Sequence, residues 1–171
     1  MFTSDADFQR AYWPLLQNGA VNLFWRPAIL AEALDNLSKL GYEIGEVSCR
    51  SGRSSLYKQF SRILHWKEQF GYYPWSGDLN ALSDGLSDYP FGSAGRSALV
   101  LDGFHLLANE DSEYAHAVLD IIESRARDHL LTGKILICLV QTDDNHYECP
   151  HIGCRHANWN RREWFWSERG R

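Results

Sequence analysis

The feature that most constrains the fold is a pair of wholly apolar runs separated by a helical pattern. ALVL, at 98–101, and ILICLV, at 135–140, contain no charged or hydrogen-bonding side chain apart from one thiol. Short runs without alternation are typical of strands buried on both faces of a parallel sheet. Between them, Val118 and Ile122 recur at helical spacing, and Gly133 is expected to end that helix. The order strand, helix, strand predicts an α/β fold.

The first half of the chain repeats this alternation. Residues 21–25 and 43–49 have the composition of strands, and a helical pattern that begins at Pro27 separates them. A further helix is expected to begin at Ser54 or Ser55, either of which can cap it. We therefore predict a small, mostly parallel β-sheet flanked by helices.

Length and composition favour one domain over the whole chain, 1–171. With 171 residues, 44% of them apolar, the chain can bury a sizeable core. Residues 1–20 are expected to form an N-terminal extension, and 141–171 a C-terminal extension that packs on the core. The N-terminus lacks the apolar region of a signal peptide, and no apolar run approaches the roughly 18 residues of a membrane span. A cytoplasmic protein with reduced cysteines, no membrane partner and no cofactor is the expectation.

An acidic segment gives the first indication of function. Residues 68–95 contain four acids and no lysine or arginine, in a chain of net charge −5. Leucines recur on one face of the helix expected near its centre, whereas Asn80, Asp84 and Asp88 fall on the adjacent face. The pI near 5.8 argues against nucleic acid as a direct partner, because phosphate binding needs a basic surface. A basic protein or a cationic ligand is the expected partner.

Two interpretations stay open for this segment. Tyr72, Tyr73 and Trp75 either form a recognition platform, as rigid aromatics do at binding hot spots, or fill the core beneath a loop. Asp84 and its neighbours either serve a cationic partner or form an ordinary solvated face.

Signals of catalysis are weak throughout. The strings GxSxG, GxGxxG, HExxH and Walker A do not occur, and the turn at 49–55 lacks the arginine that a cysteine phosphatase needs. We therefore expect no enzyme activity. The string CPHIGCRH supplies four possible zinc ligands within eight residues, although an incidental Pro/Gly loop is favoured over a metal site. These ligands are Cys149, His151, Cys154 and His156.

The string YYPWSGDLNALSDGLSD resembles the signature of the barstar family, bacterial protein inhibitors of secreted ribonucleases such as barnase. SSLYKQFSRIL resembles the helix that precedes this signature, and SALVLDGF and GKILICLVQ resemble the last two strands of the family. The N-terminal strand and helix and the ending WNRREW are similar to those of longer barstar-like proteins, so the resemblance covers roughly residues 21–169.

The resemblance implies a parallel sheet with surrounding helices, no enzymatic activity, and a helix that plugs the active site of a ribonuclease with the loop before it. Asp84 falls on the family's main inhibitory carboxylate, which occupies a phosphate subsite. Tyr72 or Tyr73 falls on its interface tyrosine. Tyr89 falls near an interface tryptophan, and Asp128 near a further interface acid.

Two departures distinguish this chain from the family pattern. Asn80 stands where the pattern has a second aspartate, and Ser83 stands where the type member has an aromatic side chain. Asp78 and Asp88 could restore the charge from other positions. The expectation is an intracellular immunity protein against a basic ribonuclease, as in a toxin–antitoxin pair; a binding module with a non-nuclease target and a zinc-binding protein are the alternatives. The expected contact residues are Tyr72, Tyr73, Trp75, Asp78, Asn80, Ser83, Asp84, Ser87, Asp88, Tyr89 and Asp128.

Overall fold

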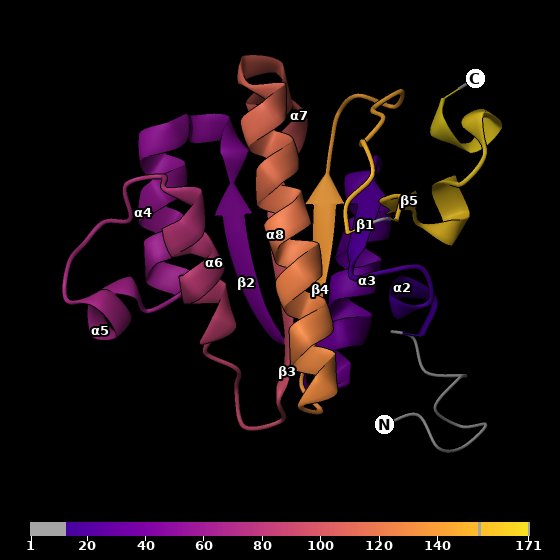
Figure 1. The fold of residues 1–171 in the computed structure, drawn as a ribbon. Helices are drawn as coiled ribbons and strands as arrows, with labels where there is room; N and C mark the ends of the chain where they lie inside the picture. The colour runs from indigo at the N-terminus through magenta and orange to yellow at the C-terminus, as the bar shows by residue number, and fades with distance from the viewer. Residues whose placement is uncertain (1–12, 154, 171) are drawn as a thin grey trace.

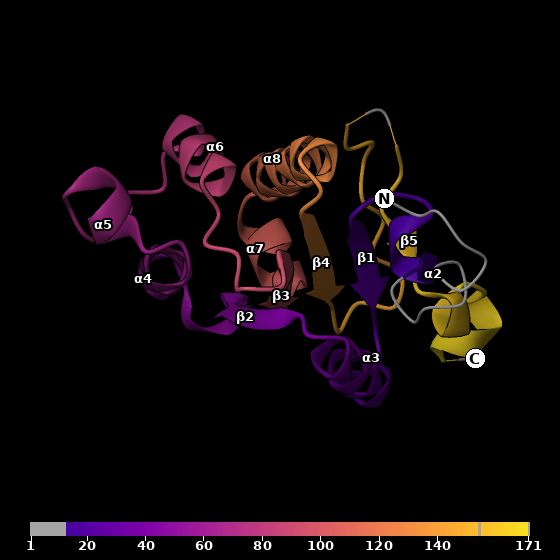
Figure 2. The same ribbon diagram turned by 90° about the horizontal axis from the view of Figure 1, so that it is seen from below.

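The structure is a five-stranded sheet with helices on both faces (Figures 1 and 2). It is a computed structural model that describes residues 13–153 and 155–170, so most of the expected N-terminal extension lies outside the described residues. The described strands are arranged in the order β2-β3-β4-β1-β5, and every pair of neighbours is parallel. The predicted α/β fold with a small parallel sheet is confirmed. The strands are β1 (Val21–Phe24), β2 (Glu43–Ser48), β3 (Arg96–Asp102), β4 (Ile135–Gln141) and β5 (Asn158–Trp159).

The two apolar runs are the central strands β3 and β4, and both of their faces are buried. Leu99 pairs with Cys138, and both side chains belong to the larger core cluster on one face of the sheet. Their neighbours Val100 and Leu139 belong to the second cluster on the other face. Because side chains alternate along a strand, burial of both faces requires an unbroken apolar run.

The helices divide unequally between the two faces. One face is covered by α3 (Pro27–Lys39), together with Leu15 of the short helix α2 (Trp13–Leu16). The opposite face carries the larger cluster, to which four longer helices and α5 contribute (Figure 2). These are α4 (Arg53–Ile63), α5 (Trp66–Phe70), α6 (Leu79–Ser87), α7 (Phe104–Glu110) and α8 (Ser112–Leu131). None of the helices in the described part of the chain is long and apolar enough to cross a membrane.

Neither α4 nor α3 begins with a side-chain cap. The prediction that Ser54 or Ser55 caps the helix after β2 is wrong: α4 begins at Arg53, after Gly52 with φ +76°. Arg26, at the start of α3, has no side-chain cap. Instead, Glu163 near the C-terminus accepts hydrogen bonds from the backbone N–H groups of Trp25 (3.0 Å) and Arg26 (2.8 Å). Both N–H groups lie just before the first turn of α3, so the C-terminal segment holds the chain where it enters the helix.

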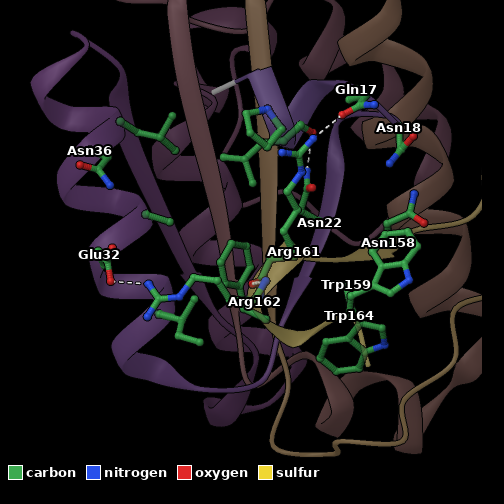
Figure 3. Close-up of a pocket in the computed structure, with 17 residues that line it drawn as sticks. Gln17, Asn18, Asn22, Glu32, Asn36, Asn158, Trp159, Arg161, Arg162 and Trp164 are labelled. Carbon is green, nitrogen blue, oxygen red and sulfur yellow. Dashed lines mark hydrogen bonds and ion pairs between the residues drawn. The ribbon is translucent and has the colours of Figure 1, made fainter. Parts of the chain in front are cut away.

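The C-terminal segment continues through two short helical turns, η2 (Arg161–Glu163) and η3 (Trp166–Arg169), on the side of the molecule away from α6 (Figure 1). It meets α3 and the end of α2 around a hollow of about 520 Å³ (Figure 3). Arg162 pairs with Glu32 of α3, and Arg161 donates to Gln17 at 2.8 Å, so two adjacent arginines connect the segment to both walls.

The carboxyl ends of β2, β3 and β4 are joined by one arginine. Arg50 donates from Nε to Asp102 and from Nη1 to Asp143, each at 2.9 Å, and from Nη2 to Gln141 at 3.0 Å. The hydrogen bond from Arg50 is the main reason that the pKa of the Asp143 carboxyl lies below its ordinary value of 3.8. Ionised Asp143 is therefore favoured by the folded state.

This network predicts a specific loss of stability in acid. Because Asp143 has a lower pKa folded than unfolded, its contribution is present above pH 3.8 and is lost as the pH falls through the folded pKa. Asp143→Asn should reduce stability at neutral pH and make the acid limb of the stability curve less steep. Urea unfolding across that pH range, with Asp35→Asn as the control, measures both effects. A mutant curve parallel to that of the wild type would contradict the prediction.

Candidate partner-binding site

Helix α6 is positioned by its leucine face and by one close helix contact. Leu82 and Leu86 are fully buried, as the helical wheel predicted. Gly85 is also buried, and a Cβ atom at this position would lie 2.7 Å from the Trp66 ring. The absence of a side chain at Gly85 therefore allows α6 to pack directly on Trp66, which fixes the depth of the helix in the protein.

The adjacent face of α6 is exposed and carries free acceptors. Asn80, Asp84, Ser87 and Asp88 are all exposed. The carboxylates of Asp84 and Asp88 form no hydrogen bond or ion pair with any residue that the structure describes. We call Asn80, Asp84, Ser87 and Asp88 the acceptor face.

Asp78 has a different role from these residues. Its Oδ1 accepts a hydrogen bond from the backbone N–H of Ala81 at 2.8 Å, so it is the N-cap of α6. The carboxylate is exposed, but one of its oxygens already serves the helix. Asp78 therefore stabilises the first turn of the helix that carries the acceptor face.

A base from a distant part of the chain reaches the edge of the acceptor face. Arg125 of α8 donates from Nε (3.0 Å) and Nη2 (2.9 Å) to the Ser83 hydroxyl, and from Nη1 to Asp128 at 2.9 Å. Ser83 is half-buried and occupied by this contact. Asp128 is exposed and pairs with Arg125, and its role at an interface stays a prediction. No local pattern predicts this contact, because Arg125 lies 42 residues after Ser83.

The loop before α6 exposes two of its three aromatic residues. Tyr72 and Tyr73 are 46% and 52% exposed, whereas Trp75 is fully buried. The Trp75 ring packs at 5.0 Å from that of Tyr57 and at 5.5 Å from that of Phe60, measured between ring centroids. The prediction that Trp75 contacts a partner is therefore wrong. For this residue the alternative is correct, because its ring fills the core beneath the loop.

Tyr89, at the other end of α6, is also a core residue. It is only 6% exposed, and its ring centroid lies 5.0 Å from that of Phe91. The expectation of a contact role for Tyr89 is corrected by this burial. Nearby, His129 of α8 lies with Nε2 2.8 Å from the Leu86 carbonyl oxygen, to which its Nε2–H tautomer donates. This contact joins the last turn of α6 to α8.

Trp75 fixes the tyrosine loop by hydrogen bonds as well as by packing. Its backbone N–H donates to Ser61 at 2.7 Å, and its indole N–H donates to the Asp78 carbonyl at 2.9 Å. Trp75→Phe keeps most of the apolar burial and removes the indole donor. We expect the free energy of unfolding to fall by about 1–3 kcal/mol, because the Asp78 carbonyl keeps only the N–H of Leu82 as donor and the smaller ring leaves a cavity in the core. Urea unfolding measures the change, and an unchanged midpoint would contradict it.

The Cys/His segment is only partly assembled. Cys149 is half-buried, and burial raises the pKa of its thiol to about 11. His151 and His156 are neighbours, whereas Cys154 lies outside the described residues. Within 13–153 and 155–170, no group of three or more His, Cys, Asp or Glu residues could hold a metal ion. Cys49, Cys138 and Cys149 are free thiols.

The fold and this surface define the class: a small parallel α/β protein that presents an acidic helix beside two exposed tyrosines. Within that class, the chain belongs to the Barstar (barnase inhibitor) family, whose model matches residues 47–141, over half of the 171 residues. The match runs from the end of β2 to β4 and includes all of α6. No curated protein and no solved structure matches this chain.

Proposed function

We propose that this protein inhibits a basic ribonuclease by inserting the acceptor face of α6 into the active site of the enzyme. The observation that carries the proposal is Asp84, an exposed carboxylate on the family's signature helix with no partner among the described residues. A ribonuclease must present cationic side chains to the phosphate of its substrate. A carboxylate held on a rigid helix can take the place of that phosphate.

The surroundings of Asp84 fit such a role. Because Asp84 and Asp88 form no internal ion pair with the described residues, binding a cation breaks no bond of the free protein. Two bases lie near this face: Arg125, whose donors are directed to Ser83 and Asp128, and Lys134, whose Nζ lies 5.3 Å from the Phe91 ring centroid. Tyr72 and Tyr73 supply exposed aromatic area in the loop that leads into α6, which suits a protein partner better than a small cation.

The proposed activity is binding, without catalysis by this chain. We place it in the cytoplasm, as an immunity protein that protects the cell from its own ribonuclease or from a delivered toxin. Free thiols at Cys49, Cys138 and Cys149 agree with a reducing compartment.

The proposal is tested with basic ribonucleases encoded beside this chain. Cleavage of a labelled RNA is measured while the inhibitor is titrated, and calorimetry gives the stoichiometry and the salt dependence. We expect inhibition that is complete at one inhibitor per enzyme and binding that weakens with salt. Unimpaired cleavage by every candidate enzyme would exclude this function. Capture of a partner without phosphate-binding residues would favour the non-nuclease module, for which Asn80 and Ser83 are the distinguishing positions.

A further inference from the structure

His151 and His156 face each other across a tight hairpin. Ile152 and Arg155 exchange backbone hydrogen bonds of 2.7 and 2.9 Å and form an antiparallel bridge. The next pair outward, His151 and His156, is therefore a non-hydrogen-bonded pair, in which side chains approach most closely. Since Ile152 is buried in the core, its neighbour His151 is directed to solvent, and His156 lies exposed opposite it.

The hairpin is held in place by three residues of α8. Asp120 accepts from the Gly153 N–H at 2.6 Å, and Arg127 donates to the Gly153 carbonyl at 3.1 Å. His116 lies with Nε2 2.8 Å from the His151 carbonyl oxygen. Together with the buried Ile152 side chain, these contacts fix the backbone on both sides of the histidine pair.

The two imidazoles converge on one point. Their Nε2 atoms lie 2.6 Å apart, their ring centroids lie 3.8 Å apart, and the ring planes are nearly perpendicular at 87°. Neither ring forms an ion pair with an acid among the described residues. An approach this close requires that at least one of the two Nε2 atoms carries a lone pair. Two neutral rings meet this requirement when one Nε2 is an N–H donor and the other is the acceptor.

We propose that His151 and His156 form a bidentate site for a divalent transition-metal ion of the group that imidazole prefers, such as Zn²⁺ or Ni²⁺. Two nitrogens on a tetrahedral zinc ion, each at about 2.0–2.1 Å from the metal, lie roughly 3.3 Å apart. The present separation of 2.6 Å therefore has to widen by less than about 1 Å, which small rotations of the exposed rings provide. The ring that carries its proton on Nε2 can exchange it through solvent for one on Nδ1, and this change of tautomer leaves a lone pair on both Nε2 atoms for the metal.

The remaining coordination positions are open to water or to an external ligand. No third described residue completes the set, and the Cys149 thiol interacts with Tyr147. A site with two protein ligands and open positions binds metal reversibly, in contrast to a closed structural zinc site. Mg²⁺ and Ca²⁺, which require oxygen ligands, should not bind there.

The experiment is a calorimetric titration of full-length protein that was stripped with chelator and carries no polyhistidine tag. Zn²⁺ and Ni²⁺ are each titrated, and Mg²⁺ serves as the negative control. We expect one saturable site per chain for Zn²⁺ and Ni²⁺, and no heat of binding for Mg²⁺. His151→Ala and His156→Ala should each weaken binding by on the order of tenfold or more, since each removes one of two ligands.

Matched variants make the result decisive. His65→Asn removes another exposed histidine, keeps a residue that tolerates the left-handed backbone at φ +50°, and should bind as the wild type does. Protection of His151 and His156 from diethyl pyrocarbonate by Zn²⁺ gives a second readout on unmutated protein. Two results would overturn the proposal. One is the absence of a saturable site, and the other is metal binding that persists in both His151→Ala and His156→Ala. The second result would overturn it whatever the effect of Cys154→Ser on binding.

Discussion

Replacing Asp84 by alanine should weaken the binding of a basic ribonuclease by about 2–5 kcal/mol, or roughly thirtyfold to several thousandfold. That range holds for the truncation of one partner of a buried, hydrogen-bonded ion pair at an interface, and barnase–barstar complexes helped to set it. The loss is large because the cations of the enzyme would be buried in the complex without their counter-charge. Asp84 is exposed in the free protein, so its removal should leave the fold unchanged.

The comparison that isolates this effect uses a second exposed carboxylate. Asp35→Asn removes a charge from α3, on the opposite face of the sheet, and should leave the dissociation constant within a few-fold of the wild-type value. Dissociation constants for Asp84→Ala, Asp84→Asn and Asp35→Asn are measured by calorimetry. Equal effects of Asp84→Ala and Asp35→Asn would show that net charge, not the placement of Asp84, governs binding.

Replacing Glu163 by alanine should lower the free energy of unfolding by about 2–4 kcal/mol. The carboxylate is fully buried and accepts from the N–H groups of Trp25 and Arg26 and from the Asn160 side chain. Alanine leaves these donors without an acceptor. The ion pair with Arg26 adds little to the estimate, because the Arg26 side chain is 45% exposed and solvent screens it.

Urea unfolding of Glu163→Ala is best compared with Glu148→Ala. Glu148 belongs to the same C-terminal segment, and its carboxylate is exposed. Its replacement should change stability by no more than about 0.5 kcal/mol. If both variants unfold at the same urea concentration, the Glu163 carboxylate does not hold the C-terminal segment to the start of α3.

The sequence predicted those parts of the fold that have a clear period. Strands β3 and β4 were recognisable because both faces are buried, and α6 because its leucines repeat at helical spacing. Strand β5 was missed, since its two residues, Asn158 and Trp159, are too few to show a period. The helix start at Arg53 was missed because a glycine precedes it in place of a side-chain cap.

The candidate site was predictable where it depends on one helix and unpredictable where it depends on tertiary contacts. The exposure of Asp84 and Asp88 follows from the helical wheel alone. Trp75 and Tyr89 were misplaced because an aromatic-rich segment contains both core and surface rings, and local sequence does not distinguish them. Arg125 enters from α8, so its contact with Ser83 depends on how two helices pack.

The place of β1 in the sheet has a consequence for synthesis of the chain. This strand is the first of the described strands to be made, yet its neighbours are β4 and β5, which end at Gln141 and Trp159. During translation, β1 therefore has no hydrogen-bonding partner in the sheet until β4 has been synthesised, more than 100 residues later. Strand pairs so distant in sequence form slowly, because the chain loses the entropy of closing a long loop before any stabilising contact forms. The sheet is therefore complete only after the chain has been synthesised through Trp159.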